Sequence, residues 1–418
     1  GSARRLPRPR QRGRRHPPRR DRARCADTRA LRSQRSADLV SLRRSAPRGA
    51  ARRERGRPAR SQRHRPRHDR PRGGLRAPDG PAGADVRRIL VLRFRALGDV
   101  LLATPLLAAL RRRYPHARID YLVDAPLAPL LAGSPDIDRL LAYPRRARPR
   151  WLSDLRWALR LRRERYDLLL DLQGSGTSAL FTLFSGAPRR HGYRVRHRHY
   201  FYTLKAERGW PAARGRPYAP INHFLLVESL GIAPGDLSLR LPSPPPGAPD
   251  PLPAGPGPCL LVAPGATWSA KQWPAAHYAA LVRDRRAAGW RVALMGAPAE
   301  AALLAEIAAG SGATVLATPA IATMVAAIRH ADLLLSGDSG ARHVAVALGT
   351  PSLALFGPSD PQIWSVLDAR HPWLRRELAC SPCGLTRCPV AGHPCMNGLT
   401  PTEVSARLAA MHAEPGGP

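Results

Sequence analysis

The chain has 418 residues, enough for two or three domains, and a formal net charge of +38. So large a basic excess first indicates contact with nucleic acid or with an anionic membrane surface. The sequence contains no run of 18 or more apolar residues and no recognisable secretory signal. We therefore expect no transmembrane helix and a cytoplasmic protein that is basic enough to lie on a membrane surface.

Much of the charge lies in the first 80 residues. They hold 28 arginines against 6 acidic residues, which is +22 of the net charge, and no aromatic residue. Without apolar periodicity such a stretch cannot bury a core, so we expect residues 1–85 to be a disordered basic segment. It is either a tail that contacts nucleic acid or anionic lipid, or a stretch that is not native protein. The second interpretation is favoured because the chain opens with Gly-Ser and its first methionine is Met295.

Residues 86–241 alternate between short apolar runs and helical patterns. The helix at 151–165 is predicted to be amphipathic and basic, with Trp151, Leu155, Leu159 and Leu161 as its apolar residues. This alternation predicts a parallel sheet with helices on both faces. We predict strands at 88–93, 119–123, 139–143 and 167–172, helices at 98–113, 151–165, from 178 onward and at 221–230, and little periodic structure at 186–220.

A proline- and glycine-rich stretch at 242–258 predicts a semi-rigid linker and hence a domain boundary. The alternation restarts at 259 and runs to 412. We therefore predict an α/β fold with two doubly wound, Rossmann-like domains, 86–241 and 259–412, that face each other across a cleft. The strands expected in the second domain are 259–263, 290–295, 314–317, 333–336 and 352–356, and its helices are the segment that ends at 288 and those at 299–309, 321–328 and 341–348.

Four loops at the carboxyl ends of predicted strands carry polar residues, and ligands of open α/β sheets bind at such ends. These loops are 95–99, 171–174, 264–274 and 337–340. In the last loop, the N–H groups of Ser339 and Gly340 begin a helix and predict a phosphate site. Asp338 beside them either accepts hydrogen bonds from sugar hydroxyls or simply caps the helix, and both interpretations stay open.

Lys271 in the third loop is one of only two lysines in an arginine-rich chain. A retained lysine indicates a site that needs a compact charge, and phosphate is the expected partner, with hydroxyls from Thr267 or Ser269 nearby. The alternative is a solvated loop lysine.

Four motifs in this order resemble the ADP-heptose:lipopolysaccharide heptosyltransferases of glycosyltransferase family 9. They are LRFRALGDVLLATPLLAALRRRYP, YDLLLDLQG, PGATWSAKQWP and SGDSGARHVAVALGTPSLALFGPSDP. The resemblance spans about residues 88–407. It implies a GT-B fold, with an amino-terminal acceptor domain and a carboxyl-terminal nucleotide-sugar domain. It also implies transfer of heptose from ADP-heptose to the lipopolysaccharide inner core at the cytoplasmic face of the inner membrane, with inversion and without a metal.

The resemblance also implies roles for individual residues. Asp99 matches the family's proposed base, Lys271 its diphosphate lysine and Asp338 the acidic residue near donor hydroxyls. On chemical grounds an inverting transfer needs one base and a cation for the departing diphosphate. Asp99 could otherwise only complement a helix dipole. The candidate site is Asp99 for catalysis, Thr267, Lys271, Asp338, Ser339, Gly340 and His343 for the donor, and Arg93, Arg95 and Gln173 for the acceptor.

One departure concerns the last motif, where relatives usually continue with Pro-Met-His and this chain has Ala341-Arg342-His343. A cation in a first helical turn is unfavourable unless it meets an anion such as the diphosphate. His343 is either a donor contact or a helix-packing residue. The identity of the donor sugar and of the acceptor therefore stays open. A relative that uses another nucleotide-sugar is one alternative, and non-specific nucleic-acid binding through the basic segment is another, less favoured one.

Four cysteines, Cys380, Cys383, Cys388 and Cys395, lie close together near the carboxyl terminus. Their spacing matches no familiar zinc finger, although four thiols could hold a structural zinc. Free or redox-labile thiols are the alternative, and disulfides are not expected in the cytoplasm. We expect no cofactor in the active site.

Overall fold

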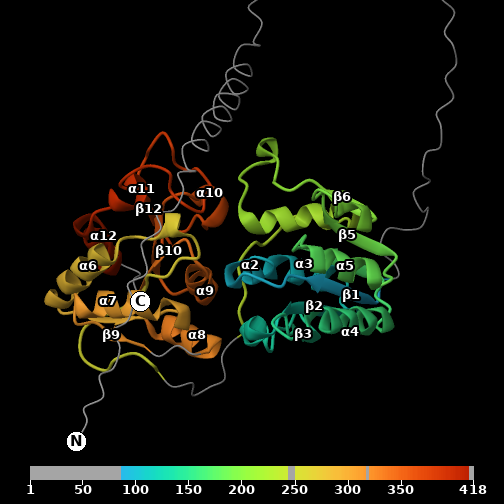
Figure 1. Cartoon of the computed structure of the whole chain (residues 1–418), viewed down its shortest axis with the longest axis horizontal. Helices are drawn as coiled ribbons and strands as arrows, with labels where there is room; N and C mark the ends of the chain where they lie inside the picture. Colours follow the sequence, from blue (N-terminus) through green and yellow to red (C-terminus); the bar gives the residue numbers. More distant parts are fainter. Residues whose placement is uncertain (1–85, 243–249, 317–319, 414–418) are drawn as a thin grey trace, which may run out of the picture. The chain divides into compact units, whose positions relative to one another are not determined.

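The computed structural model describes residues 86–242, 250–316 and 320–413. The predicted basic segment at 1–85, and residues 243–249 of the predicted linker, lie outside the described residues. Two six-stranded sheets organise the described chain, and every strand pairing in them is parallel. The predicted α/β class with two doubly wound sheets is therefore confirmed (Figure 1).

The first sheet has the order β3-β2-β1-β4-β5-β6. Its strands are β1 Arg88–Leu92, β2 Arg118–Asp124, β3 Arg139–Tyr143, β4 Leu168–Asp171, β5 Arg189–Tyr193 and β6 Leu204–Ala206. Its α-helices are α2 Leu97–Leu101, α3 Thr104–Arg113, α4 Arg150–Arg163 and α5 Gly176–Phe184, and its 3₁₀ helices are η1 Ala125–Leu131, η2 His199–Phe201, η3 Ala212–Arg214, η4 Ala219–Leu226 and η5 Glu228–Leu230.

The second sheet repeats this topology in the order β12-β11-β10-β7-β8-β9. Its strands are β7 Cys259–Ala263, β8 Arg291–Leu294, β9 Thr314–Val315, β10 Leu333–Gly337, β11 Ser352–Phe356 and β12 Trp373–Arg375. Its helices are α6 Ala275–Ala287, α7 Ala301–Ala309, α8 Ile321–His330, α9 Gly340–Leu348, α10 Pro361–Trp364, α11 Pro394–Asn397 and α12 Pro401–Ala413, with 3₁₀ turns η6 Ser269–Lys271 and η7 Pro298–Glu300.

Alternate residues of each central strand enter opposite layers, as a sheet covered on both faces requires. In β1, Leu90 and Leu92 pack with α4 and α5, whereas Ile89 and Val91 join the layer of α2 and α3. In the second sheet, α6, α7 and α12 cover one face and α8 and α9 cover the other. The α8–α9 layer belongs to the same apolar cluster as the α2–α3 layer.

Two predicted helices are wrong in form. The single helix expected at 98–113 is divided into α2 and α3, because Pro105 in the first turn of α3 has no N–H to continue the hydrogen-bond ladder. The segment 221–230 forms the 3₁₀ turns η4 and η5 in place of an α-helix. The stretch 186–220, expected to lack periodic structure, contributes strand β5 and the edge strand β6.

A further correction concerns α4. Of its four predicted apolar residues only Leu161 is buried, and Trp151, Leu155 and Leu159 are exposed. Within the described residues, no helix has the length and apolar character needed to cross a membrane.

Candidate functional site

The four predicted loops lie at the two topological switch points of the sheets. The first two loops follow β1 and β4, which are neighbours in the first sheet. The other two follow β7 and β10, which are neighbours in the second. In a doubly wound sheet, the helices that leave two such strands go to opposite faces, which opens a crevice at their carboxyl ends.

Two glycines bring the start of α2 against the start of α9. A Cβ at Gly98 would lie 2.5 Å from Cδ2 of His343, and a Cβ at Gly340 would lie 2.9 Å from Cδ2 of Leu97. Neither position has room for a side chain, so the two helix starts approach more closely than any other residue would allow. Asp99 on α2 thereby comes close to the loop of Asp338 and Ser339.

Asp99 is held from one side. Its Oδ2 forms an ion pair with Nη2 of Arg93 at 2.5 Å and accepts a hydrogen bond from the Ala96 N–H at 3.2 Å. Arg93 is itself fixed, because its Nη1 donates to the Leu172 carbonyl at 2.5 Å. Among the described residues, Oδ1 of Asp99 has no hydrogen-bond partner, so one carboxylate oxygen remains available to another group. The carboxylate thus serves the helix start and also lines a cavity.

That cavity has a volume of about 410 Å³. Residues that the sequence did not single out line it beside Arg93 and Asp99: Tyr193, Arg208, Trp210, His223 and Trp364. Most come from the stretch 186–220 and from η4, where the sequence shows no recognisable motif. A tryptophan and an arginine two residues apart, at 208–210, are the one local signal that could have indicated them, since both residue types favour binding sites.

His223 in this cavity is uncharged near neutral pH. The hydroxyl of Tyr193 and Nδ1 of His223 are hydrogen-bonded at 2.8 Å. Burial lowers the pKa of His223 to about 3, and the charges of Arg93 and Arg208 add to the effect. The guanidinium of Arg208 also lies over the Tyr193 ring, 5.0 Å from its centroid.

Lys271 and Asp338 meet directly, although they are 67 residues apart in the chain. Nζ of Lys271 lies 2.6 Å from Oδ2 of Asp338, and the hydroxyl of Ser359 donates to the same oxygen at 2.6 Å. Nζ also lies over the Trp268 ring, 4.5 Å from its centroid. The interpretation of Lys271 as a solvated loop lysine is therefore wrong, since its side chain is only 17% exposed.

The residue that occupies the N-cap position of α9 is Ser339. Asp338 is therefore not the helix cap, which removes one of its two sequence-based interpretations. Ser339 makes no capping hydrogen bond, and its hydroxyl is buried without a partner among the described residues. Gly340 begins the helix beside it. Thr267 is exposed on the loop before Lys271.

His343 and Arg342 lie side by side on α9 and face different surroundings. His343 is buried against Gly98, and burial lowers its pKa to about 4, while the charges of Asp338, Arg342, Asp99 and Lys271 also act on it. This packing fits the helix-packing interpretation of His343 and places it between the two loops.

Arg342 is fully buried, and the expectation that its cation needs the diphosphate is wrong. It donates to the carbonyls of His371 at 2.7 Å and Pro372 at 3.4 Å, and to the hydroxyl of Ser365. These oxygens compensate the charge, although burial lowers the arginine's pKa to about 10.

Arg95 and Gln173 line a second cavity of about 330 Å³, together with Arg145, Arg150 and the first residues of α5. Oε1 of Gln173 accepts from the N–H groups of Phe94 at 3.2 Å and Arg95 at 3.3 Å, so this amide fixes the loop that follows β1. The Arg95 side chain is exposed. The structure therefore separates the three predicted acceptor residues into two neighbouring cavities.

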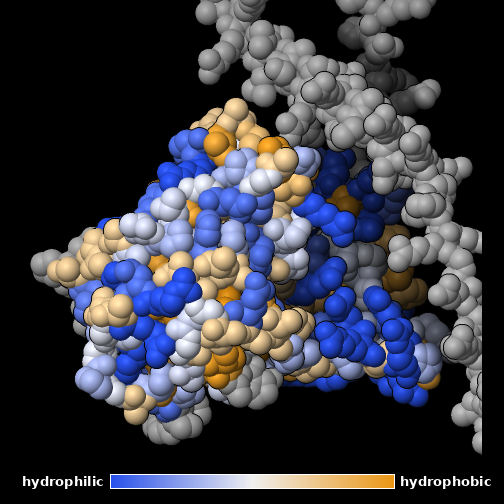
Figure 2. Space-filling view, turned by 60° about the vertical axis from the view of Figure 1, so that its left-hand side comes forward, coloured by the Kyte–Doolittle hydropathy of each residue, from blue (hydrophilic) through white to orange (hydrophobic). Residues whose placement is uncertain are grey.

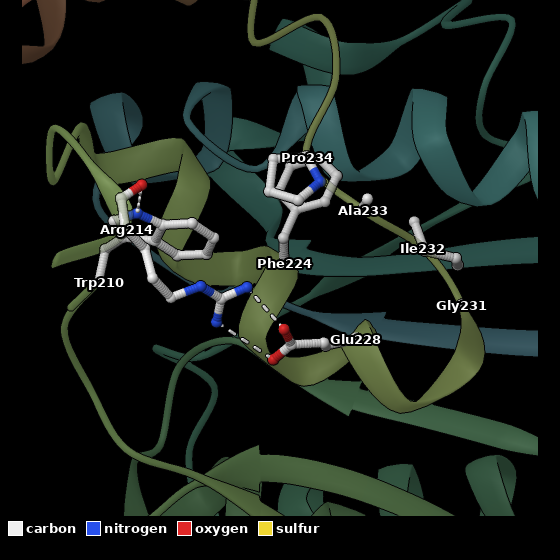
Figure 3. Close-up of a pocket in the computed structure, with 8 residues that line it drawn as sticks. All are labelled: Trp210, Arg214, Phe224, Glu228, Gly231, Ile232, Ala233 and Pro234. Carbon is white, nitrogen blue, oxygen red and sulfur yellow. Dashed lines mark hydrogen bonds and ion pairs between the residues drawn. The ribbon is translucent and has the colours of Figure 1, made fainter.

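A smaller cavity of about 200 Å³ lies on the far side of Trp210, and its polar groups satisfy one another (Figure 3). Nη2 of Arg214 lies 2.6 Å from Oε1 of Glu228, and the Trp210 indole donates to the Arg214 carbonyl at 3.1 Å. With its charges already paired, this cavity has little capacity to bind a charged ligand.

The cysteine segment packs beneath the Lys271 loop. Nε2 of His393 lies 2.8 Å from the Ala270 carbonyl, and the Ala270 N–H donates to the Thr386 carbonyl at 3.2 Å. Its four cysteines are free thiols. Within the described parts of the chain, no three His, Cys, Asp or Glu side chains are arranged to hold a metal, so the structure gives the zinc prediction no support.

Comparison with known proteins identifies the family. The model of glycosyltransferase family 9 (heptosyltransferase) matches residues 155–392. The chain belongs to this family. It is therefore a glycosyltransferase, as its motifs predicted.

Its relatives match over almost their whole length. Lipopolysaccharide heptosyltransferase 1 of Pseudomonas aeruginosa is 28% identical, over 78% of this chain and 99% of that protein. Among solved structures, Escherichia coli ADP-heptose lps heptosyltransferase II superimposes with a TM-score of 0.63 at 24% identity, over 78% of this chain and 98% of that one. The Escherichia coli heptosyltransferase WaaC with ADP gives a TM-score of 0.59 at 21% identity, over 78% and 99%. These superpositions support the GT-B fold.

Proposed function

We propose that this enzyme transfers a heptose from ADP-heptose to the inner core of lipopolysaccharide, inverting the anomeric carbon without a metal ion. The observation that carries the proposal is the close packing of α2 on α9, where the charges of Asp99, Lys271 and Asp338 all act on the buried His343. A base and a cation for the leaving group then lie at one crevice. The relatives named above are lipopolysaccharide heptosyltransferases, and one solved relative is described with ADP.

Asp99 is the proposed base. Its Oδ1 is free to accept the proton of the acceptor hydroxyl, while Arg93 and the Ala96 N–H hold Oδ2. A base held in one rotamer by two fixed donors needs little reorganisation when the hydroxyl attacks. The hydroxyl oxygen forms a bond to the anomeric carbon, and the bond from that carbon to the diphosphate breaks.

Lys271 and the start of α9 are the proposed site for the departing diphosphate. The Ser339 hydroxyl, buried without a partner, fits a donor to a phosphate or sugar oxygen, and helix starts favour anions. Asp338 holds Lys271 in place and offers its carboxylate to sugar hydroxyls. Thr267 and Gly340 border this region, and the buried His343 packs against it. In this arrangement the second sheet carries the donor, and the first sheet carries the acceptor.

The acceptor lies, in this proposal, in the cavity of Asp99. Arg93 and Arg208 line it and can bind an anionic sugar, and Trp210 offers an aromatic face to a sugar ring. Arg95 and Gln173 border the neighbouring cavity, where a further anionic group of the acceptor would lie. The enzyme would work at the cytoplasmic face of the inner membrane.

The donor can be tested directly. We expect ADP-heptose to raise the melting temperature, and UDP- and GDP-sugars to leave it unchanged. Nuclear magnetic resonance of the product then reports the anomeric configuration, and turnover in excess chelator reports metal dependence. Stabilisation by a UDP- or GDP-sugar in place of ADP-heptose would favour the alternative, a relative with another donor.

A separate sample that has not been exposed to chelator addresses the cysteines. Elemental analysis of the purified protein measures bound zinc directly. About one zinc per chain that is lost when Cys383 and Cys388 are both changed to Ser would support the structural-metal interpretation. A metal-free protein with four titratable thiols would support free thiols.

A further inference from the structure

Helix α4 has apolar residues on two faces. Leu161 and Ala158 face the sheet and are buried. Trp151, Leu155 and Leu159 follow one another at intervals of four residues, so they form a stripe along the helix. Their exposed fractions are 68%, 49% and 47%. A surface helix of a globular protein usually has one apolar stripe, which packs on the core. Among the described residues, the second stripe of α4 therefore has no packing partner.

Helix α5 extends this stripe into a surface. It packs beside α4, and its Leu180, Leu183 and Phe184 are 46%, 40% and 50% exposed. Tyr200 on η2, which contacts α5, is 73% exposed. We call the exposed residues Trp151, Leu155, Leu159, Leu180, Leu183, Phe184 and Tyr200 the α4–α5 face.

The remaining described surface has no comparable concentration. The other large apolar side chains that are exposed are Val315, Leu367, Leu385 and Val390, which belong to separate segments of the second half. Figure 2, in which that half faces the viewer, shows apolar residues scattered among hydrophilic ones. Contiguous exposed apolar surface in a soluble protein usually marks a binding partner or a membrane.

Unpaired arginines border the α4–α5 face. Arg156, Arg160, Arg162 and Arg163 are exposed on α4. Within the described chain, none of the four has an ion-pair partner; Arg160 only stacks on Trp157, 4.7 Å from its ring centroid. An apolar stripe with aromatic residues and a border of arginines is the pattern of a helix that lies in a membrane interface.

The second arginine-lined cavity lies at one end of this face. Arg150, which directly precedes Trp151, lines it together with Gly176 and Thr177 at the start of α5. Nη2 of Arg150 donates to the Thr177 hydroxyl at 2.7 Å, which ties the two helix starts together. Arg95 and Arg145 complete the lining. Arg145 and Arg150 are ion-paired with Asp124 at 3.1 Å and with Asp154 at 3.5 Å, so Arg95 is the guanidinium of this cavity that has no ion pair among the described residues.

We propose that the α4–α5 face is the surface by which this enzyme docks on an anionic lipid bilayer, with the Arg95–Arg145–Arg150 cavity at its edge left to the acceptor. The docking itself is argued from exposure and charge alone. That this docking brings a lipid-linked acceptor to Asp99 rests on the proposed function. The loop from Arg95 to Asp99 links the two cavities, since the Ala96 N–H donates to the Asp99 carboxylate.

Charge favours lipid over a second copy of this chain. A two-fold interface pairs the same patch with itself, so it would bring the four arginines of α4 against their symmetry equivalents. Like charges across an interface cost affinity. An anionic bilayer instead supplies phosphate to every arginine and hydrocarbon to every apolar side chain.

Vesicle flotation of the full chain tests the apolar part. The probe is phosphatidylcholine vesicles with about one third phosphatidylglycerol, at low salt and at about 0.5 M salt, where exposed charges are screened. Leu155→Ser/Leu159→Ser should reduce the salt-resistant binding at least tenfold, because two apolar side chains no longer enter the interface. Leu367→Ser is the matched control, an exposed leucine in the second half, and should bind as the native chain does. Residues 1–85 are present in every variant, so their contribution is constant.

A second measurement locates the contact. Brominated acyl chains quench only tryptophans that reach the hydrocarbon, and Trp151 is the tryptophan of the proposed face. Trp151→Phe should keep vesicle binding and lose most of the quenching. Arg156→Gln/Arg160→Gln/Arg163→Gln should lose the preference for anionic over neutral vesicles, whereas Arg329→Gln on α8 should keep it.

The outcomes separate docking from catalysis. Native binding by Leu155→Ser/Leu159→Ser, or quenching unchanged in Trp151→Phe, would overturn the proposal. The proposal would also be overturned if the native chain sediments as a dimer, the double variant sediments as a monomer, and neither binds vesicles. The face would then be an interface between copies. The double variant should also keep native turnover on a water-soluble acceptor fragment. If the native chain transfers no heptose, the proposed function fails, yet the vesicle measurement still stands.

Discussion

The two halves of this enzyme share a topology and differ in how their polar groups are placed. In the second half, the charges at the carboxyl edge of the sheet are paired and largely buried: Lys271 with Asp338 and Ser359, and Arg342 with carbonyl oxygens. In the first half, the ion pair of Arg93 with Asp99 lines an open cavity of about 410 Å³, the exposed Arg95 lines one of about 330 Å³, and apolar side chains face outward on α4 and α5.

The difference indicates two kinds of ligand. Preorganised, buried charges suit a small ligand whose charge and shape are constant, because the site needs no rearrangement to bind it. Open, arginine-lined cavities beside an exposed apolar face suit a large anionic molecule presented at a surface. One fold repeated twice thus serves two tasks through its loops and outer helices, and the following changes test that division.

The largest expected effect is at Asp99, in the first half. Asp99→Asn keeps the size and the contacts of Oδ2 but cannot accept the acceptor proton. General-base catalysis contributes about 10²–10⁴-fold, so kcat should fall by that order while ADP binds with native affinity.

Calorimetry with ADP and a turnover assay measure both quantities. Turnover within a few-fold of native, or ADP affinity lost in step with activity, would assign Asp99 to the helix start or the nucleotide. The division of labour between the halves would then be wrong.

The next effect is at Lys271, in the second half. Lys271→Ala removes a cation from the proposed diphosphate site. The loss of transition-state stabilisation measured by kcat/KM should be about 2–4 kcal/mol, and the KM for the donor should rise. The variant also leaves Asp338 without its ion-pair partner, which lowers stability by itself. Lys271→Met/Asp338→Asn separates the two causes, because it removes both charges together.

We expect this double variant to have a higher melting temperature than Lys271→Ala but the same weakened affinity for the donor. Recovery of donor affinity as well would mean that Lys271 serves only to neutralise Asp338. The preorganised site of the second half would then be a structural ion pair.

The sequence predicted the four loops because a doubly wound topology brings the carboxyl ends of particular strands together, whatever the details of packing. Gly349 and Pro351 likewise predicted the end of α9, and Gly349 ends the helix in the left-handed conformation at φ 73°. Alternating apolar runs were sufficient for the central strands, which are buried on both faces.

Long-range pairings could not be predicted in this way. Strand β5 reads Arg-Arg-His-Gly-Tyr, and only its neighbours reveal it as a strand. The pairing of Lys271 with Asp338 depends on β7 and β10 lying side by side. The burial of Arg342 depends on carbonyls at 371 and 372, beyond the next strand. Helical periodicity also predicted an apolar stripe on α4 without indicating that it faces outward.

Arg342 gives the next prediction, because it is a buried cation where the first half has exposed ones. Arg342→Ala leaves a cavity and three oxygens without their donor, which should cost about 2–4 kcal/mol of stability. In a chain of this size that corresponds to a fall of roughly 3–6 °C in melting temperature. Arg95→Ala, an exposed arginine of the first half, should change stability by less than about 0.5 kcal/mol.

Thermal unfolding measures both variants, and ADP calorimetry checks that Arg342→Ala keeps donor affinity. If stability is native and ADP affinity falls, then Arg342 acts on the diphosphate after all, as the sequence pattern first indicated.

The smallest effect concerns pH, through histidines buried in both halves. Burial lowers the pKa of His223 in the first half to about 3, and the pKa of His343 and His371 in the second half to about 4. An unfolded histidine has a pKa of about 6.5, so between the two values the unfolded chain binds more protons than the folded one. Stability is therefore complete above pH 6.5 and falls as the pH drops toward 4. Each histidine should contribute about 1 kcal/mol of loss between pH 7 and pH 5.5.

His371→Gln removes one of these titrations and can keep a hydrogen bond to the Ser352 hydroxyl, which now lies 2.9 Å from Nδ1 of His371. Burial also lowers the pKa of His191, so four buried histidines share the slope. The free energy of unfolding should then fall less steeply with pH, by about one quarter of the combined slope, even if the variant is less stable at pH 7.5. His330→Gln, at an exposed position that ends α8, should leave the slope unchanged. Denaturant unfolding at pH 7.5, 6.5 and 5.5 measures the three slopes. A slope in His371→Gln equal to the native one would show that His371 is hydrated in solution. The second half would then be more open than its buried charges imply, and the contrast with the first half would weaken accordingly.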